Sequence, residues 1–215
     1  MNKVNSQIFS RQNLCSTVTF LNVVHLQFAM ANSVDEYAYE LKIPRERIAV
    51  LIGKEGAVKK QIESATATSL DIDSNEGEVK LIGTDAIGLY TCREVVRAIG
   101  RGFNPEIAFL LLKQDYGFEM ISIADFADTK NDSVRLKGRV IGESGKSRRV
   151  IEELTGCNVS VYGKTVALVG GVEWLPSARR AVEALLSGSP HSAVYHWLEK
   201  RRKELRHREL AGDVW

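Results

Sequence analysis

Two loops that carry glycine at both ends are the segments of this sequence best suited to binding an anion. They read Gly53-Lys54-Glu55-Gly56 and, 89 residues later, Gly142-Glu143-Ser144-Gly145, and an isoleucine precedes each. Glycines at both ends let the backbone turn tightly and approach a ligand without hindrance from a Cβ atom. A helix that begins directly after such a loop offers free N–H groups and a positive dipole to an anion. The pattern predicts a contact with the phosphodiester backbone of a nucleic acid.

Basic side chains surround both loops and are candidate phosphate ligands. The first loop has Lys54 within it and Lys59 and Lys60 one turn later, whereas the second has Lys146, Arg148 and Arg149 at the start of its helix. Each loop also carries a carboxylate, Glu55 or Glu143, which disfavours a phosphate unless it points to solvent. We therefore expect the second loop to be the stronger contact and the first to be weaker or supporting. Lys137 and Arg139 precede the second loop and are expected either to reach phosphates or to form a solvated helix face.

The residues around the loops repeat, so the elements that position them can be predicted twice. AVKKQIESAT at 57–66 aligns with KSRRVIEELT at 146–155, and both segments predict a helix. Alternating strands are expected at 69–73 and 78–83 in the first copy, and at 158–162 and 165–170 in the second. Long helices are expected at about 84–100 and 172–187. A helix runs into each loop, the first from Pro44 and the second from about residue 133.

A further strand is predicted in front of each copy. In the first, at 36–43, the alternation predicts that Tyr37, Tyr39, Leu41 and Ile43 face a core, and in the second the strand spans about 118–124. Each copy thus has the order β-α-α-β-β-α, which places the protein in the α+β class. Apolar side chains near the loops form either core or groove walls: Ile48, Ile52, Ile62, Ile72, Leu136, Ile141, Ile151 and Val161.

These elements divide the sequence into five segments. Residues 1–32 form an N-terminal extension, either disordered or mispredicted, with Met30 as the expected true start. The first copy spans 33–103 and the second spans 118–188. A helical connector at 104–117, centred on an apolar helix at 106–113, separates them. A basic helix is expected at about 191–208 within the last segment, 189–215.

The charge distribution agrees with an anionic partner for the second copy. The whole chain has a formal net charge of only +2. Residues 1–129 hold 13 basic and 17 acidic side chains, whereas residues 130–215 hold 16 and 10. Six of the basic residues lie in the tail at 199–209, beside three glutamates. The tail is expected either to add affinity for RNA or to form a solvated helix surface.

Several other functional classes find no support in the sequence. Cys15, Cys92 and Cys157 are far apart and form no C-x-x-C, so neither a disulfide framework nor a zinc site is predicted. Gly145-Lys146-Ser147 resembles the end of a phosphate-binding P-loop, but Val140 stands where that motif requires glycine. No catalytic constellation, metal site or cofactor site is predicted, and no apolar run is long enough for a membrane span. We expect a cytoplasmic protein that is not an enzyme.

The paired I-G-x-x-G segments and the order of elements resemble KH domains, whose G-x-x-G loop holds about four single-stranded nucleotides. The strand order resembles the eukaryotic type, type I, because the bacterial type places its two adjacent strands before the loop. The resemblance implies two tandem type I KH domains followed by a C-terminal helix. It also implies that the protein binds single-stranded RNA through the loop residues named above.

From about Ser33 onward, the chain resembles the archaeal two-KH RNA-binding protein of small-ribosomal-subunit assembly. The loops, their spacing and the total length carry this resemblance. It implies binding near the 3′ end of small-subunit ribosomal RNA and help in pre-rRNA processing by other enzymes. A PIN-domain endonuclease or other ribosome assembly proteins are the implied partners, since the eukaryotic relative partners such a nuclease. Two alternatives remain open: a KH-fold scaffold that mainly contacts protein, and a KH protein of transcription elongation or of the exosome.

Overall fold

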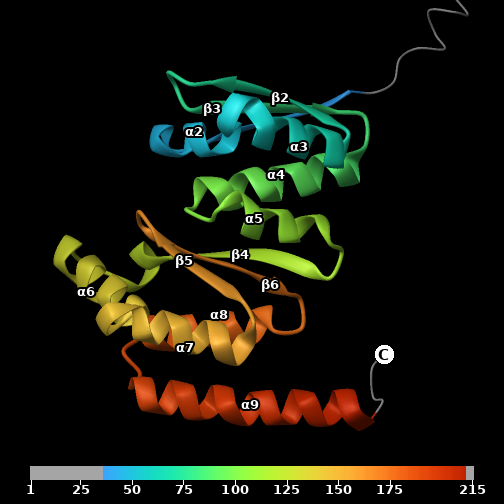
Figure 1. Cartoon of the computed structure of the whole chain (residues 1–215). Coiled ribbons are helices and arrows are strands. Elements are labelled where there is room, and N and C mark those ends of the chain that lie inside the picture. Colours follow the sequence, from blue (N-terminus) through green and yellow to red (C-terminus); the bar gives the residue numbers. More distant parts are fainter. Residues whose placement is uncertain (1–35, 212–215) are drawn as a thin grey trace, which may run out of the picture. The chain divides into compact units, whose positions relative to one another are not determined.

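Each G-x-x-G loop joins two helices that pack on a three-stranded sheet in the computed structural model, which describes residues 36–211 (Figure 1). The expectations for residues 1–32, including a start at Met30, lie outside the described residues. Both copies belong to one unit that begins at Tyr37. No helix in the described part of the chain combines the length and the apolar character needed to cross a membrane.

The first copy has the predicted order of elements. These are β1 (Tyr37–Lys42), α2 (Arg45–Ile52), α3 (Ala57–Thr66), β2 (Thr68–Asp73), β3 (Glu78–Gly83) and α4 (Ala86–Gly100). The antiparallel sheet has the order β1-β3-β2, so that β3 pairs with both edge strands. Asp85 caps the N-terminus of α4, because its carboxylate accepts hydrogen bonds from the N–H groups of Ile87 and Gly88. Such an N-cap is a common start signal of a helix.

The second copy repeats this order and topology. Its elements are β4 (Tyr116–Ser122), α6 (Lys130–Ile141), α7 (Lys146–Thr155), β5 (Asn158–Tyr162), β6 (Thr165–Gly171) and α8 (Leu175–Leu186). The sheet order β4-β6-β5 matches that of the first copy. Helix α6 begins before the expected residue 133, because the Thr129 hydroxyl accepts from the Asp132 N–H at 3.2 Å and caps the helix. The two copies therefore confirm the α+β class and the doubled β-α-α-β-β-α order.

The connector and the C-terminal helix differ in detail from expectation. The connector holds a short helix α5 (Pro105–Ala108) followed by a 3-10 helix (Phe109–Leu112), where one helix at 106–113 was expected. Helix α9 (His191–Ala211) extends beyond residue 208, and its Val194 and Leu198 are 4% and 2% exposed. Two buried side chains one turn apart attach α9 to the core of the second copy.

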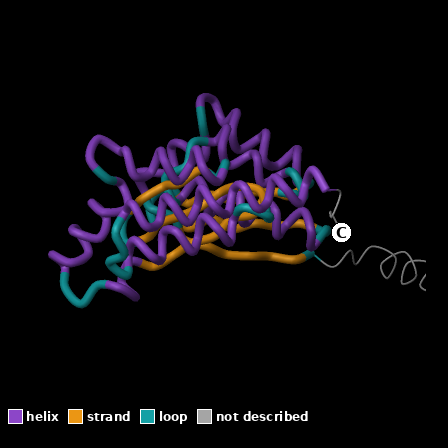
Figure 2. The backbone as a smooth tube through the Cα atoms, turned by 90° about the horizontal axis from the view of Figure 1, so that it is seen from below, coloured by secondary structure: helices purple, strands orange, loops and turns teal. Residues whose placement is uncertain are grey.

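Each copy has its own apolar core between its sheet and its helices. Figure 2 traces the backbone of these helices and strands. Leu51, Ile62 and Leu81 are fully buried in the first core, and Ile151 and Leu168 in the second. Burying a side chain of this size contributes roughly 1.5–3 kcal/mol. These cores hold the helices on either side of each loop in place.

Tyr37 and Tyr39 lie on the face of β1 that carries the core, opposite Gly83 and the buried Leu81, but they are not buried as core residues are. Their exposed fractions are 49% and 39%, whereas Ile43 at 5% is buried as expected. Strand β1 is an edge strand that pairs only with β3. Its first residues therefore lie at the border of the sheet face that α4 covers. Arg93 of α4 instead meets Tyr39, with its guanidinium carbon 4.6 Å from the ring centroid.

The second sheet also packs against elements of the first copy and the connector. Ala167 and Val169 of β6 belong to the apolar cluster that contains Ala108 of α5. The Ser160 hydroxyl donates to the carbonyl of Arg101 at 2.8 Å. Strand β6 is consequently buried on both faces, which explains its continuous apolar sequence.

Candidate nucleic-acid interface

The two G-x-x-G loops have the same backbone conformation. The first glycine of each loop has φ and ψ of 72° and 178° at Gly53, and of 74° and 172° at Gly142. The third loop residue is left-handed in both, with φ of 53° at Glu55 and 52° at Ser144. A short 3-10 turn follows the first glycine in each case. The sequence repeat is therefore also a repeat of loop geometry.

The two glycines of a loop are required for different reasons. A Cβ atom on Gly142 would lie 2.6 Å from the backbone nitrogen of Ser147, whereas one on Gly145 would meet nothing within 4 Å. Gly145 is needed for its φ of +77°, which favours glycine. The pair Gly53 and Gly56 behaves in the same way, since only the first is crowded by the following helix.

Helices α3 and α7, which follow the loops, begin without a side-chain cap. Their N-cap residues are Gly56 and Gly145, and neither N-terminus receives a side-chain hydrogen bond. By contrast, Asp85 and Thr129 cap helices α4 and α6. The first N–H groups of an α-helix lack partners within the helix, so α3 and α7 leave them available to an anionic ligand.

Three predicted basic residues gather at the second loop. Arg149 donates from Nη2 to the carbonyl of Ser144 at 2.6 Å, so its guanidinium lies against the loop. Arg148 lies with Nε 3.8 Å from Oε2 of Glu152, whose other oxygen accepts from the N–H of Val159 in β5. Lys146 is exposed, as is Glu143. The loop thus has a guanidinium held against it and an exposed ammonium group beside it, and its carboxylate is exposed to solvent.

The first loop has a similar arrangement in which all of the cations are lysines. Lys59 lies with Nζ 3.9 Å from Oε1 of Glu63, and that carboxylate accepts from the N–H of Leu70 in β2. Lys54, Glu55 and Lys60 are exposed. Because no arginine lies on α3, only lysine cations are available at this helix, and they lack the planar fork with which arginine binds phosphate.

Arg139 is engaged by backbone carbonyls of the second copy. Its guanidinium donates to the carbonyl of Leu185 at 3.1 Å and to that of Ser189 at 2.6 Å. It therefore holds the C-terminal end of α8. Arg47 has a comparable role in the first copy, where it donates to the carbonyls of Ile99 and Phe103. Lys137 is half-buried on α6.

The apolar residues near the loops divide into core and surface. Ile48, Ile62, Leu136 and Ile151 are buried core residues. The other four keep exposed area and are the candidates for groove walls: Ile52, Ile72, Ile141 and Val161.

A surface hollow beside the second loop adds two residues that the sequence did not single out. Val150 and Glu153 line it together with the loop residues Glu143 and Ser144 and the cations Lys146 and Arg149. The spacing of Lys146, Val150 and Glu153 on one helix face was the available signal. The hollow extends the candidate interface along α7.

The described residues include no cluster of side chains that could hold a metal ion. Burial raises the pKa of the Cys157 thiol to about 11 and also raises the pKa of Cys92. Both thiols are buried and stay protonated near neutral pH, which makes them poor nucleophiles.

Family models of the KH domain match both copies. Residues 117–203 match the model described as the eukaryotic type KH domain, KH-domain type I, and residues 38–98 match the general KH domain model. The two copies are therefore KH domains, as the loops and the order of elements predicted.

Comparison with known proteins identifies the family. A KH domain-containing protein of Methanocaldococcus jannaschii is 52% identical over 179 residues, which cover 81% of this chain and 78% of the relative. The matched chain in the crystal structure of an a/eIF2alpha-aDim2p-rRNA complex from Pyrococcus horikoshii is 44% identical, with a TM-score of 0.75 and coverage of 81% of this chain and 99% of that one. The RNA-binding protein pno-1 of Caenorhabditis briggsae is 35% identical over 114 residues, 52% of this chain and 41% of the relative.

The chain belongs to the family of archaeal two-KH RNA-binding proteins of small-ribosomal-subunit assembly that includes Dim2p. The family that the sequence resembled is thereby confirmed, together with its two KH domains.

Proposed function

We propose that this protein clamps single-stranded RNA with its G-x-x-G loops, mainly through the second copy. The single observation that carries the proposal is the second loop itself, where an uncapped helix N-terminus coincides with Lys146, Arg148 and Arg149. Backbone N–H groups and guanidinium groups are the usual ligands of phosphodiester oxygens. Glu143 and Ser144 form the turn on which the RNA backbone would lie, with Gly142 and Gly145 giving close approach. Lys137 on α6 is proposed as a more distant contact to the RNA.

The first loop is proposed as a weaker contact. Gly53 and Gly56 give it the same turn, but Lys54, Lys59 and Lys60 are its cations and no arginine lies on α3. A guanidinium binds phosphate through two parallel hydrogen bonds, and an ammonium group cannot. Affinity should therefore depend less on this loop.

We further propose that the RNA is the 3′ region of small-subunit ribosomal RNA, and that the protein assists subunit assembly and pre-rRNA processing in the cytoplasm. Two similar proteins support this proposal. One is the matched chain in the structure of the a/eIF2alpha-aDim2p-rRNA complex, and the other is named RNA-binding protein pno-1.

The test compares two double variants that change the middle residues of a loop and leave its glycines in place. Glu143→Asp/Ser144→Asp makes the second loop more negative by one charge, and Lys54→Asp/Glu55→Asp makes the first more negative by two. Binding of a fluorescein-labelled 12-nucleotide RNA from the rRNA 3′ end is measured by anisotropy. We expect the second-loop variant to lose roughly tenfold or more in affinity, about 1.4 kcal/mol, and to lose more than the first-loop variant.

This design separates the clamp from general electrostatics. If affinity follows net charge alone, the first-loop variant is the weaker binder, because it has the larger charge change. Unchanged affinity in both variants would reject the clamp.

A second function, contact with a protein partner, is favoured by an exposed patch on the first copy. Tyr37, Tyr39, Ile87 and Tyr90 have exposed fractions of 49%, 39%, 76% and 59%. The guanidinium carbon of Arg93 lies 4.6 Å from the ring centroid of Tyr39 and 5.9 Å from that of Tyr90. Tyrosine and arginine are enriched at protein interfaces and among the residues that dominate their binding energy.

We propose a PIN-domain endonuclease as the partner for this patch. A Tyr39→Ala/Tyr90→Ala variant should then lose co-elution with the nuclease in size-exclusion chromatography while it retains affinity for the 12-nucleotide RNA. Retained co-elution would reject the patch as the nuclease contact, and RNA affinity lost with it would indicate that the tyrosines contact RNA.

A further inference from the structure

A pocket of about 560 Å³ lies on the second copy, at the opposite end of α7 from the G-x-x-G loop. The C-terminal end of α7, the residues after β6, the start of β4 and helix α9 form its walls. Pockets of roughly 300–1,000 Å³ accommodate small ligands. The functional site described above does not include this pocket.

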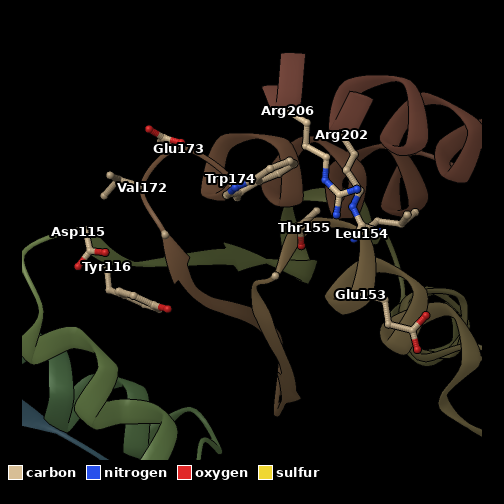
Figure 3. Close-up of a pocket in the computed structure, with 12 residues that line it drawn as sticks. Asp115, Tyr116, Glu153, Leu154, Thr155, Val172, Glu173, Trp174, Arg202 and Arg206 are labelled. Atoms are coloured by element: carbon tan, nitrogen blue, oxygen red, sulfur yellow. The ribbon is translucent and has the colours of Figure 1, made fainter. Parts of the chain in front are cut away.

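Two arginines of α9 reach into the pocket beside an aromatic ring (Figure 3). Arg202 and Arg206 lie over the end of α7 near Thr155, and Trp174 lies next to them. They follow the buried Leu198 along α9 at intervals of four residues, with Arg202 half-buried and Arg206 exposed. Among the described side chains, no hydrogen bond or ion pair engages either guanidinium, whereas neighbouring Arg201 pairs with Glu204 at 3.4 Å. Like charges four residues apart on a helix repel each other, which an anion between them would offset.

Three carboxylates also line the pocket. Asp115 and Glu173 lie across Trp174 from the guanidiniums, and Glu153 points away from them (Figure 3). Guanidinium groups at one end, an aromatic ring in the middle and carboxylates at the other end suit a ligand with both an anionic and a hydrogen-bond-donating part. A nucleotide has this chemistry, because its phosphate accepts from arginine, its base stacks on an aromatic ring, and an N–H group of the base, such as N3–H of uracil, donates to a carboxylate.

The pocket also shares a lining residue with the candidate RNA interface. Glu153 lines both the pocket and the hollow that begins at Ser144 and Lys146. Helix α7 has 10 residues, and at about 1.5 Å per residue it separates the loop from the pocket by roughly 15 Å. An RNA strand that leaves the loop along this face of α7 therefore arrives at Arg202 and Arg206.

We propose that this pocket binds a nucleotide of the same RNA strand that the second loop clamps, with its phosphate on Arg202 and Arg206 and its base on Trp174. The proposal rests on the RNA binding proposed above. It assigns the basic tail a specific contact, where the sequence allowed either general attraction for RNA or a solvated surface.

The test is the affinity of an unstructured 12-nucleotide oligouridylate, measured between 50 and 300 mM salt. Arg202→Ala/Arg206→Ala is compared with Lys200→Ala/Lys203→Ala, a matched control on the same helix whose lysines are exposed and do not line the pocket. We expect the arginine variant to lose roughly 10- to 100-fold in affinity. The slope of log K against log salt should become shallower by about 0.7, the change expected when one phosphate contact to a single strand is lost. The lysine control should lose less than threefold and keep its slope.

Equal losses in the two variants would overturn the proposal, because general charge would then suffice. An unchanged arginine variant would overturn it as well, provided that Glu143→Asp/Ser144→Asp still weakens binding. If that loop variant is also unaffected, the proposed function fails first, so the two failures are distinguishable. Thermal unfolding of each variant verifies the fold, and Arg202→Lys/Arg206→Lys, which keeps both charges, should show an intermediate loss because lysine lacks the bidentate fork.

Trp174 gives a second readout. In a Trp197→Phe/Trp215→Phe background it is the remaining one of the three tryptophans. Saturating oligouridylate should quench its fluorescence, and the additional Arg202→Ala/Arg206→Ala change should abolish the quenching. Fluorescence that stays constant while the RNA binds would contradict stacking on Trp174.

Discussion

Alanine substitution of the two glycines in the second loop should have clearly different effects on stability. A Cβ at Gly142 meets the Ser147 nitrogen at 2.6 Å and the Ser147 Cβ at 2.7 Å. Its φ and ψ of 74° and 172° also lie in a region that is essentially restricted to glycine. At Gly145 the φ is +77°, but nothing lies within 4 Å of an added Cβ. The left-handed helical conformation costs a side-chain-bearing residue roughly 1–2 kcal/mol.

The expected loss is therefore about 1–2 kcal/mol for Gly145→Ala and more than about 3 kcal/mol for Gly142→Ala, where backbone strain and a clash with the main chain add. For a protein of this size, 1 kcal/mol corresponds to about 2–4 °C in Tm. Circular dichroism melts should give a drop of about 2–8 °C for Gly145→Ala and a larger one for Gly142→Ala. Equal drops, or a larger drop for Gly145→Ala, would refute the assignment of close packing to the first glycine.

Three further predictions concern the second copy. Arg139→Ala should lower the free energy of unfolding by about 2–3 kcal/mol, because it removes two charge-assisted hydrogen bonds to the end of α8; RNA affinity should not change, and a loss of affinity in the folded variant would contradict a purely structural role. Thr129→Ala should cost about 1 kcal/mol in urea unfolding. The same change should raise the pKa of Asp132, measured by NMR, since the hydrogen bond from Thr129 is the main cause of its lowered pKa; an unchanged pKa would refute that cause. The Cys157 thiol, with its pKa raised from 9.0 to about 11, should resist iodoacetamide at pH 8 until the protein unfolds. The folded state binds this proton more tightly than the unfolded state does, so the thiol's contribution to the free energy of unfolding is fully present below pH 9 and is lost as the pH rises to about 11. Urea unfolding at several pH values should detect this decrease.

Most of the fold follows from patterns that act over short distances in the sequence. Hydrophobic alternation places the strands, and the glycine pairs mark the turns between helices, so that the doubled order of elements is predictable. The predicted start of a helix is less accurate where a single capping side chain determines it. Thr129 moves the start of α6 ahead of the expected residue 133 through one hydrogen bond to Asp132.

The errors arise where a residue depends on a partner that is distant in the sequence. Tyr37 and Tyr39 alternate like core residues, but their exposure depends on the place of β1 at the sheet edge. Arg139 lies next to the loop in the sequence, but the carbonyls that accept its hydrogen bonds are 46 and 50 residues away, so this role could not be predicted. In the tail, the sequence could not distinguish Arg202 and Arg206 from the neighbouring lysines, because the packing of α9 determines which basic residues face the pocket.

The most direct test of the proposed RNA clamp is an NMR titration of the ¹⁵N-labelled protein with the 12-nucleotide rRNA fragment. Addition of RNA should shift the amide signals of the second loop, Gly142, Glu143, Ser144 and Gly145. The dissociation constant fitted to these shifts should equal the one measured by anisotropy. The amide signals of Gly53 to Gly56 should shift less or saturate later. RNA binding without a change in the second-loop amides would contradict the clamp.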